Sequence, residues 1–237
     1  MKELLMCGRN SVLDAYENNW PIEKVIVATA QNKELFKNAS FKVEIVDKNL
    51  MNKMTKENHQ GFIALIKPIN FYDIKILNKD QPKMVLILDH IQDPQNFGAI
   101  IRSANAAGIK HIIYPNTRAA DINELVLKIS SGGFVGMKFI KVKSISATIT
   151  WMKNNGFWIY TSALNSTAQQ YDKVSYNLPF AIVVGNEGSG VSKSTLSVSD
   201  EIIYIPQSGS VQSLNVSVAT GILLFEAKKT LENEKSK

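Results

Sequence analysis

Two neighbouring stretches decide the fold of this chain: MVLIL at residues 84–88 and QDPQNFGAIIR at residues 92–102. The first is an apolar run of strand length, and the second places apolar residues at helical spacing after a polar loop. Asp93-Pro94 ends the strand, and Asn96 is positioned to cap the helix that follows. Ligands of open α/β sheets bind outside the carboxyl ends of such strands, so we expect a binding site at this loop.

The alternation of strand and helix continues to the end of the chain. It predicts an α/β fold with a mostly parallel sheet covered on both faces. Expected strands cover residues 84–88, 111–114, 139–142, 158–162, 181–184 and 202–205; expected helices cover 97–107, 122–130, 147–154 and the chain from about 214. In the last helix Val218, Ile222 and Phe225 recur at helical spacing, which predicts a stripe facing the core. Such a helix can also pack against a second subunit.

A smaller α/β unit precedes this part of the chain. Expected helices at residues 10–18, 31–38 and 48–54 alternate with expected strands at 24–29, 43–46 and 62–66. Residues 69–83 are polar, contain Pro82 and show little periodicity, which indicates a linker. The predicted organisation is a small domain at 1–68, a linker at 69–83 and a large domain at 84–237.

Composition narrows the classes of partner and compartment. The formal net charge of +6 and the pI near 9.2 favour a polyanionic partner such as nucleic acid. Arg9, Arg102 and Arg118 are the only arginines in a lysine-rich chain. Cys7 is the single cysteine, so an intramolecular disulfide and a cysteine-rich zinc site are excluded, and we expect no metal. Without a secretory signal or an apolar run of membrane-spanning length, we expect a cytoplasmic protein with no membrane partner.

Two later segments place glycine or serine after a strand. VGNEGSG at residues 184–190 allows close approach of the backbone to a ligand, but its spacing matches neither a Walker loop nor the dinucleotide fingerprint. Taken alone, it is a tight turn with Glu187 facing water. IPQSGSVQSLNVSVA at residues 205–219 enters the last helix with Ser213 and Asn215 at its start. Taken alone, it is a serine-rich helix cap with free backbone amides.

Other residues give weaker signals. The three histidines lack metal-ligand spacing and are interpreted as surface or capping residues, and no serine sits in a nucleophile elbow. The aromatic side chains near residue 157 are interpreted as core rather than as platforms for stacking bases: Trp151, Phe157 and Trp158.

Taken together, the three segments occur in the order and spacing of three motifs of the SpoU/TrmH RNA methyltransferases. The chain resembles that family in Asn96-x-Gly98-x-x-x-Arg102, in GNEG at 185–188 and in IP…SLNVSVA at 205–219. GRNSV at 8–12 and HQGF at 59–62 resemble the start and the end of the family's N-terminal substrate-binding domain. The resemblance is strongest to members that methylate a guanosine of large-subunit (23S) ribosomal RNA.

The resemblance implies a SPOUT catalytic domain with a deep trefoil knot, an exception to the rule of unknotted folds. It also implies S-adenosylmethionine bound in the knot largely by backbone, a homodimer joined through the knot region and the terminal helix, and an L30e-like N-terminal domain that binds RNA. Gln207 stands where the family commonly has methionine, and Asn186 and Phe97 also depart from frequent residues. The implied cofactor positions are Gly185, Glu187, Gly188, Ile205, Gln207, Ser213 and Leu214.

The implied reaction is in-line attack of a ribose 2′-oxygen on a sulfonium methyl group, for which positioning supplies much of the rate. Arginine stays protonated, so we interpret Arg102 as a phosphate clamp and a stabiliser of the developing alkoxide rather than as a base. Glu187 would orient Arg102 or accept a proton. The implied catalytic positions are Asn96, Arg102, Glu187, Ser213 and Asn215, and the implied RNA contacts are Arg9, Asn96 and Arg102.

Two other functions are compatible with the same sequence. One is methylation of a transfer RNA ribose by an enzyme of the same family. The other is a non-catalytic RNA-binding or ribosome-assembly protein that kept the fold, although the motif residues argue against it.

Overall fold

The computed structural model describes residues 4–210 and 213–235, and it divides the chain into two compact units. The first unit takes the chain up to residue 69 together with residues 122–135, and the second takes 70–121 and 136 onwards. The first division lies next to the boundary expected after residue 68. The segment 122–135, which the sequence assigned to the large domain, instead packs with the first unit.

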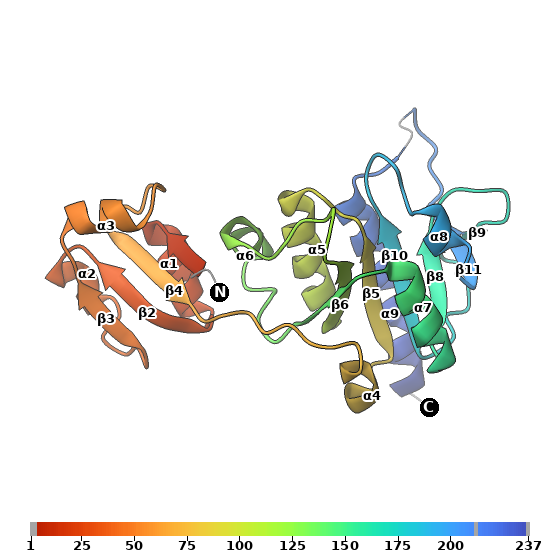
Figure 1. The fold of residues 1–237 in the computed structure, drawn as a ribbon, viewed down its shortest axis with the longest axis horizontal. Helices are drawn as coiled ribbons and strands as arrows, with labels where there is room; N and C mark the ends of the chain where they lie inside the picture. Colours follow the sequence, from red (N-terminus) through yellow and green to blue (C-terminus); the bar gives the residue numbers. More distant parts are fainter. Residues whose placement is uncertain (1–3, 211–212, 236–237) are drawn as a thin grey trace. The chain divides into compact units, whose positions relative to one another are not determined.

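The first unit is a four-stranded sheet with helices; in Figure 1 its elements from β1 to β4 are drawn in red and orange, and α6 in green. The sheet has the order β1-β4-β2-β3, in which β4 is antiparallel to β1 and β2, and β2 is parallel to β3. Strand β1 was not expected from the sequence pattern. The elements are β1 (Leu4–Cys7), α1 (Arg9–Glu17), β2 (Ile22–Val27), α2 (Ala30–Glu34), β3 (Lys42–Ile45), α3 (Lys48–Met54), β4 (Phe62–Ile66) and α6 (Glu124–Ser130).

Specific contacts hold the 122–135 segment in the first unit. Glu124 Oε1 accepts a hydrogen bond from the backbone N–H of Leu5 (3.1 Å). The rings of Trp20 and Phe134 pack edge to face with centroids 4.8 Å apart. These contacts join residues more than a hundred positions apart, so local periodicity contains no sign of them.

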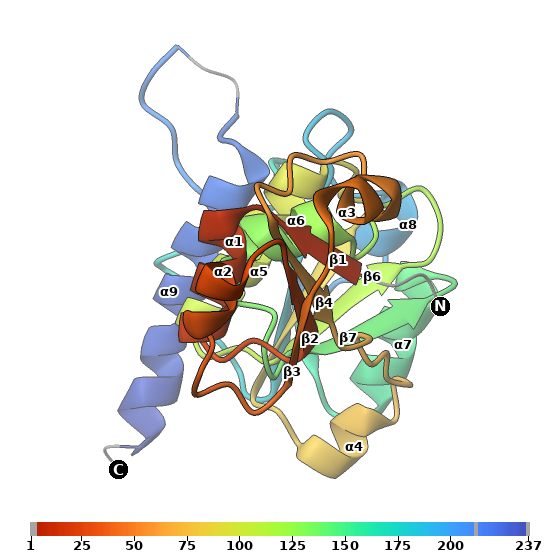
Figure 2. The same cartoon turned by 90° about the vertical axis from the view of Figure 1, so that its left-hand side faces the viewer.

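The second unit is built on a seven-stranded sheet of order β7-β6-β5-β10-β8-β11-β9, in which every pair is parallel. The expected mostly parallel α/β sheet is therefore confirmed. Figures 1 and 2 show α5 and α9 on one face of this sheet and α7 and α8 on the other. The elements are α4 (Ile76–Asp80), β5 (Met84–Asp89), α5 (Pro94–Ala106), β6 (His111–Pro115), β7 (Lys138–Val142), α7 (Ile145–Asn154), β8 (Trp158–Ser162), β9 (Gln169–Gln170), β10 (Phe180–Gly185), α8 (Lys193–Leu196), β11 (Glu201–Tyr204) and α9 (Val216–Lys235).

The stretch 69–83, which was expected to be a linker, has regular structure and packs on the second unit. This stretch contains α4, and the backbone N–H of Tyr72 donates to the carbonyl of Phe139 on β7 (2.9 Å). Leu77 is buried in the core, where Ile74 and Ile76 also pack. Because polar residues separate these three apolar residues from the rest of the segment, the sequence pattern did not reveal that they form a short apolar face.

Two expectations about helices are also corrected. Asp93, not Asn96, caps α5: its carboxylate accepts from the backbone N–H of Gln95, and Pro94 occupies the first turn. On α9 the buried face consists of Val216, Thr220, Leu223, Leu224 and Ala227. Val218 and Phe225, expected in the core, are 52% and 47% exposed. Both apolar faces have helical spacing, and only the packing of α9 on α5 decides which one is covered.

Among the described residues, no helix has the length and apolarity to cross a membrane.

The packing of Gly132 against Trp20 yields a stability prediction. Gly132 has a positive φ (+80°), and a Cβ there would lie 2.6 Å from Nε1 of the buried Trp20 ring. Gly132→Ala should therefore add overpacking to backbone strain and lower the free energy of unfolding by about 2–4 kcal/mol, measured by urea titration. Gly108→Ala, with φ +84° and no atom near the added Cβ, should lose only about 1 kcal/mol. Equal losses in the two variants would contradict the packing described.

Candidate functional site

The strand order of the second unit contains a topological switch point, where the connections from two neighbouring strands run to opposite sides of the sheet. From β5 the chain continues to β6 and β7 on one side, whereas β8, β10 and β11 lie on the other. β5 and β10 are neighbours at this switch point and pair in parallel up to Asp89↔Gly185. The loops that follow these two strands therefore leave the sheet side by side, where α/β folds bind their ligands.

The loop after β10 is a tight turn closed by backbone. The N–H of Asn186 donates to the carbonyl of Gly190 (3.0 Å), and the N–H of Gly190 donates back to the carbonyl of Asn186 (2.8 Å). A Cβ on Gly185 would collide with the backbone of Gly190 and Val191, so only glycine fits there. Asn186 Oδ1 accepts from the N–H of Gly188 (2.9 Å), which fixes the tip of the turn.

A buried carboxylate ties this turn to the end of β5. Asp89 is 1% exposed, and its Oδ2 accepts from the backbone N–H of Ser192 (2.9 Å). Its Oδ1 accepts from His90 Nδ1 (2.5 Å), and the carbonyl of His90 accepts from Asn186 Nδ2 (3.1 Å). The sequence analysis did not single out Asp89; an acidic residue that ends a fully apolar strand was the available signal.

Three of the predicted catalytic residues form one chain of hydrogen bonds. Asn215 Nδ2 donates to Asn96 Oδ1 (3.0 Å), and Asn96 Nδ2 donates to Glu187 Oε1 (2.5 Å). Asn215 Oδ1 accepts from the backbone N–H groups of Ser217 and Val218 and so caps α9. This cap leaves only the amide nitrogen of Asn215 to face Asn96, and an ionised carboxylate can only accept. Asn215 must therefore donate to Asn96, and Asn96 must in turn donate to Glu187.

The other predicted residues lie on three different elements. Arg102 is exposed on α5, about one and a half turns beyond the buried Asn96. Ser213 is exposed in the segment that leads into α9. Arg9 belongs to the first unit, where it is exposed at the start of α1 and its backbone N–H donates to Gln60 Oε1 (3.1 Å). The two N-terminal motifs, around Gly8 and around Gln60, therefore meet in space.

A cavity of about 620 Å³ adjoins this hydrogen-bonded chain at the carboxyl ends of β8, β10 and β11. Of the predicted cofactor positions, it is lined by Gly185, Glu187, Ile205, Gln207, Ser213 and Leu214; Gly188 lies in the same turn but outside the lining. The cavity also includes Ser162, Ala163 and Leu164, which the sequence analysis missed. Leu164 is 81% exposed, although a leucine is normally covered. Its place directly after a buried strand was the signal.

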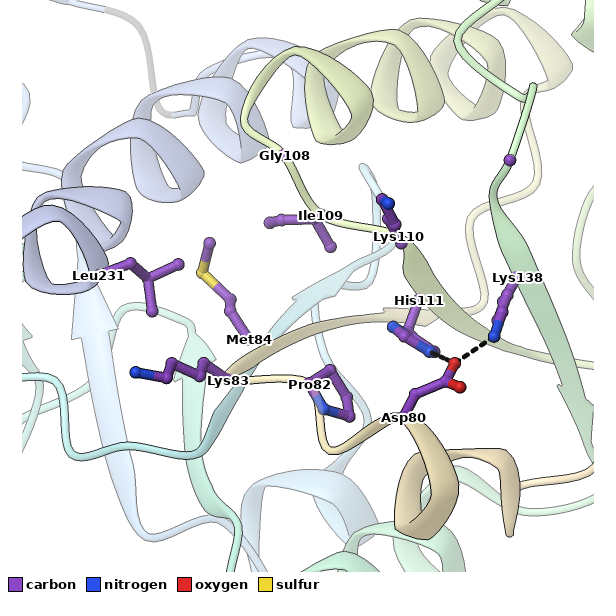
Figure 3. Close-up of a pocket in the computed structure, with 11 residues that line it drawn as sticks. Asp80, Pro82, Lys83, Met84, Gly108, Ile109, Lys110, His111, Lys138 and Leu231 are labelled. Carbon is purple, nitrogen blue, oxygen red and sulfur yellow. Dashed lines mark hydrogen bonds and ion pairs between the residues drawn. The ribbon is translucent and has the colours of Figure 1, made fainter. Parts of the chain in front are cut away.

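A second cavity, of about 480 Å³, lies at the opposite edge of the same sheet, at the amino ends of β5, β6 and β7 (Figure 3). There Asp80 accepts from His111 Nε2 (2.7 Å) and from Lys138 Nζ. Burial lowers the pKa of His111, and the bonds from Lys138 and His111 lower the pKa of Asp80. The cluster ties α4 to the sheet, so its role is structural.

The interpretation of the histidines as surface or capping residues is wrong for His111, which is buried and bound to Asp80. His59 is buried too, but its Nδ1 caps the turn that follows by accepting from the N–H of Gly61 (2.9 Å). The core assignment of Trp158 is also wrong, because this side chain is 38% exposed, whereas Phe157 is buried. Within residues 4–210 and 213–235, no group of three or more histidine, cysteine or acidic side chains is arranged to hold a metal ion.

Known families match both units. Residues 83–225 match the SpoU rRNA Methylase family, and residues 5–72 match the family described as RNA 2'-O ribose methyltransferase substrate binding. A Staphylococcus aureus protein assigned to the TrmH family of tRNA/rRNA methyltransferases is 34% identical over 95% of this chain and 96% of its own length. An uncharacterized tRNA/rRNA methyltransferase of Borreliella burgdorferi is 38% identical over 90% of this chain and 98% of its own length.

Solved structures show the same fold. The AdoMet-bound rRNA methyltransferase of Sinorhizobium meliloti superposes with a TM-score of 0.77 at 24% identity, covering 97% of this chain and 88% of that one. The TrmH/SpoU tRNA modifying enzyme of A. aeolicus superposes with a TM-score of 0.59 at 33% identity, covering 68% and 84%. Since the family matches span most of the chain and the hydrogen-bonded residues come from all three motif segments, the chain belongs to the SpoU/TrmH family of RNA methyltransferases.

Proposed function

We propose that this chain is an S-adenosylmethionine-dependent RNA ribose 2′-O-methyltransferase whose substrate is a guanosine of large-subunit (23S) ribosomal RNA. The observation that carries the proposal is the hydrogen-bonded chain Asn215–Asn96–Glu187 beside the cavity at the carboxyl ends of β8, β10 and β11. The separate unit that precedes the catalytic one supports ribosomal over transfer RNA. A ribosomal RNA substrate also supports a cytoplasmic location.

The chemistry of the cavity fits the proposed cofactor. Its volume of about 620 Å³ is large enough for S-adenosylmethionine. Leu164, Ile205 and Leu214 offer apolar surface to the adenine ring of this cofactor. Backbone groups around Gly185 and Gln207 supply polar partners for the rest. When bound, S-adenosylmethionine supplies an electrophilic methyl group. The deep trefoil knot belongs to the same proposal: it requires the segment between β11 and α9 to be threaded through an earlier loop.

The polar residues at the edge of the cavity would position the RNA. Asn96 is buried between two partners and cannot turn freely, so it holds Glu187 in place. A carboxylate has room for about four hydrogen bonds, so Glu187 keeps acceptor capacity for Arg102 or the ribose 2′-hydroxyl. Arg102 would bind the neighbouring phosphate and stabilise the negative charge that grows on the 2′-oxygen. Ser213 and Asn215 would fix the segment that closes the cavity.

Replacing Arg102 tests the proposed function. Arg102→Ala should lower transfer of labelled methyl groups to 23S ribosomal RNA by about a hundredfold or more, because a preorganised charge is lost. Its affinity for S-adenosylmethionine, measured by calorimetry, should stay within about twofold of the wild type. Arg102→Lys, which keeps the charge but not the bidentate geometry, should recover part of the rate. Near-normal turnover by Arg102→Ala would refute the assigned role.

Replacing Asn215 separates the helix cap from the link to Asn96. Asn215→Asp keeps an acceptor for the N–H groups of Ser217 and Val218 but cannot donate to Asn96. Asn215→Ala loses the cap as well, at about 1 kcal/mol. We therefore expect the aspartate variant to unfold at a higher urea concentration than the alanine variant. Both should methylate RNA about tenfold more slowly or worse. A wild-type rate in Asn215→Asp would show that the link is dispensable.

The exposed apolar face of α9 supports the homodimer that the family resemblance implies. Val218 and Phe225 together leave a large apolar surface on one side of this helix. Phe225→Asp should convert dimers to monomers in sedimentation velocity. Leu50→Asp places the same charge on a leucine of α3 that is 53% exposed, and it should leave the dimer intact. An unchanged dimer in Phe225→Asp would place the interface elsewhere.

A further inference from the structure

Arg118 is the one arginine of this chain to which neither the family resemblance nor the proposed function gives a role. It lies in the loop that follows β6, at the same edge of the sheet as the Asn96–Glu187 pair. Arginine is rare in this chain and makes up three of its 27 basic residues. Its side chain is exposed, and no ion pair joins it to any residue in the described part of the chain.

The loop that carries Arg118 is fixed at both ends. The backbone N–H of Asn116 donates to the carbonyl of Val142 at the end of β7 (2.9 Å). The N–H of Ala120 donates to the carbonyl of Ile91, just beyond β5 (2.8 Å). Arg118 itself has φ +55°, a conformation that costs a non-glycine residue about 1 kcal/mol or more. The anchored loop thus holds Arg118 at the carboxyl edge of the sheet.

The charges around this loop leave Arg118 available to an anion. Lys141 on β7 is neutralised by Asp121 (Nζ to Oδ2, 2.7 Å) and lies over the ring of Phe71, 4.2 Å from its centroid. Asp121 also accepts from the hydroxyl of Tyr114 (3.2 Å). Lys143, just beyond β7, is exposed like Arg118. The carboxyl edge of β6 and β7 therefore presents Arg118 and Lys143 as its outward cations.

The cavity restricts where the RNA can run. The proposed cofactor occupies the carboxyl ends of β8, β10 and β11, on one side of β5. An RNA chain that presents a ribose to Asn96 and Glu187 must then continue over the other side, where β6 and β7 end. With strands about 4.8 Å apart, the end of β6 lies roughly 10 Å from the end of β10. The phosphates that flank the target nucleotide would therefore lie close to the end of β6.

We propose that Arg118 binds a backbone phosphate of the RNA beside the target nucleotide. The inference rests on the proposed function, because it takes the Asn96–Glu187 pair as the place of the reacting ribose. The planar guanidinium suits a bidentate contact with phosphate, which Lys143 would support as a point charge. The contact holds the RNA in register and takes no part in the methyl transfer.

The test uses Arg118→Gly, since glycine adopts a positive φ freely and the variant should fold as well as the wild type. Steady-state methylation of a 23S ribosomal RNA transcript should show a KM raised about tenfold and a kcat within about twofold of the wild type. The slope of log(kcat/KM) against log salt should become shallower by about 0.7, as expected for one lost contact to a single strand. Arg118→Lys should keep the slope and show an intermediate KM.

Lys110→Ala is the matched control. Lys110 is an exposed cation of the same unit, but it lines the cavity at the amino edge of the sheet (Figure 3), so its loss should leave KM and the salt slope unchanged. A wild-type KM and slope in Arg118→Gly would overturn the inference, and so would a loss confined to kcat. If the wild-type protein methylates no RNA, the proposed function fails. Fluorescence anisotropy with the same transcript then still decides whether Arg118→Gly weakens RNA binding and flattens its salt dependence.

Discussion

The parallel pairing of β10 with β5 is the contact on which the rest of the second unit depends. Six residues of each strand, Phe180–Gly185 and Met84–Asp89, are paired, and almost all of their side chains are buried. Strands nearly a hundred residues apart in sequence thereby end at the same place. Their two loops must share one crevice, and every residue of the candidate site is positioned relative to it.

Because the loops share this crevice, a few polar groups suffice to join them. The buried carboxylate of Asp89 holds the turn after β10 through the N–H of Ser192. Asn96 then joins the start of α5 to that turn through Glu187 and to α9 through Asn215. Buried amides with both partners satisfied have one orientation, so these three elements keep a defined geometry. A site built in this way can hold a ribose and a phosphate in a fixed geometry.

The features that followed from sequence were those with a strong local pattern. All six strands expected in the large domain are present because they are apolar runs bounded by polar loops. The strands and helices that were missed, namely β1, α4, β9 and α8, are at most five residues long. The exposed face of α9 was assigned to the core because periodicity measures apolarity and not what covers it. The packing of 122–135 in the first unit depends on distant partners such as Trp20.

The same distinction applies to the site. Asn96, Glu187 and Asn215 were identified because three sequence segments occur together in a characteristic order and spacing. Each segment taken alone indicates only a loop or a helix cap. Asp89 and Leu164 belong to none of these motifs. Their positions at the ends of apolar strands were weak signals, and the burial of Asp89 and the cavity that Leu164 lines show their importance. From the sequence, Glu187 was expected to orient Arg102 or to accept a proton; the structure adds Asn96 as a hydrogen-bond donor to it.

The central claim is that this chain methylates a ribose 2′-oxygen of ribosomal RNA. Its most direct test is a transcriptome-wide map of 2′-O-methylated nucleotides in cells with and without the gene. The account predicts that one guanosine of 23S ribosomal RNA loses its 2′-O-methyl group when the gene is absent, and that the intact gene restores it while an Arg102→Ala copy does not. Identical maps in the two strains would contradict it.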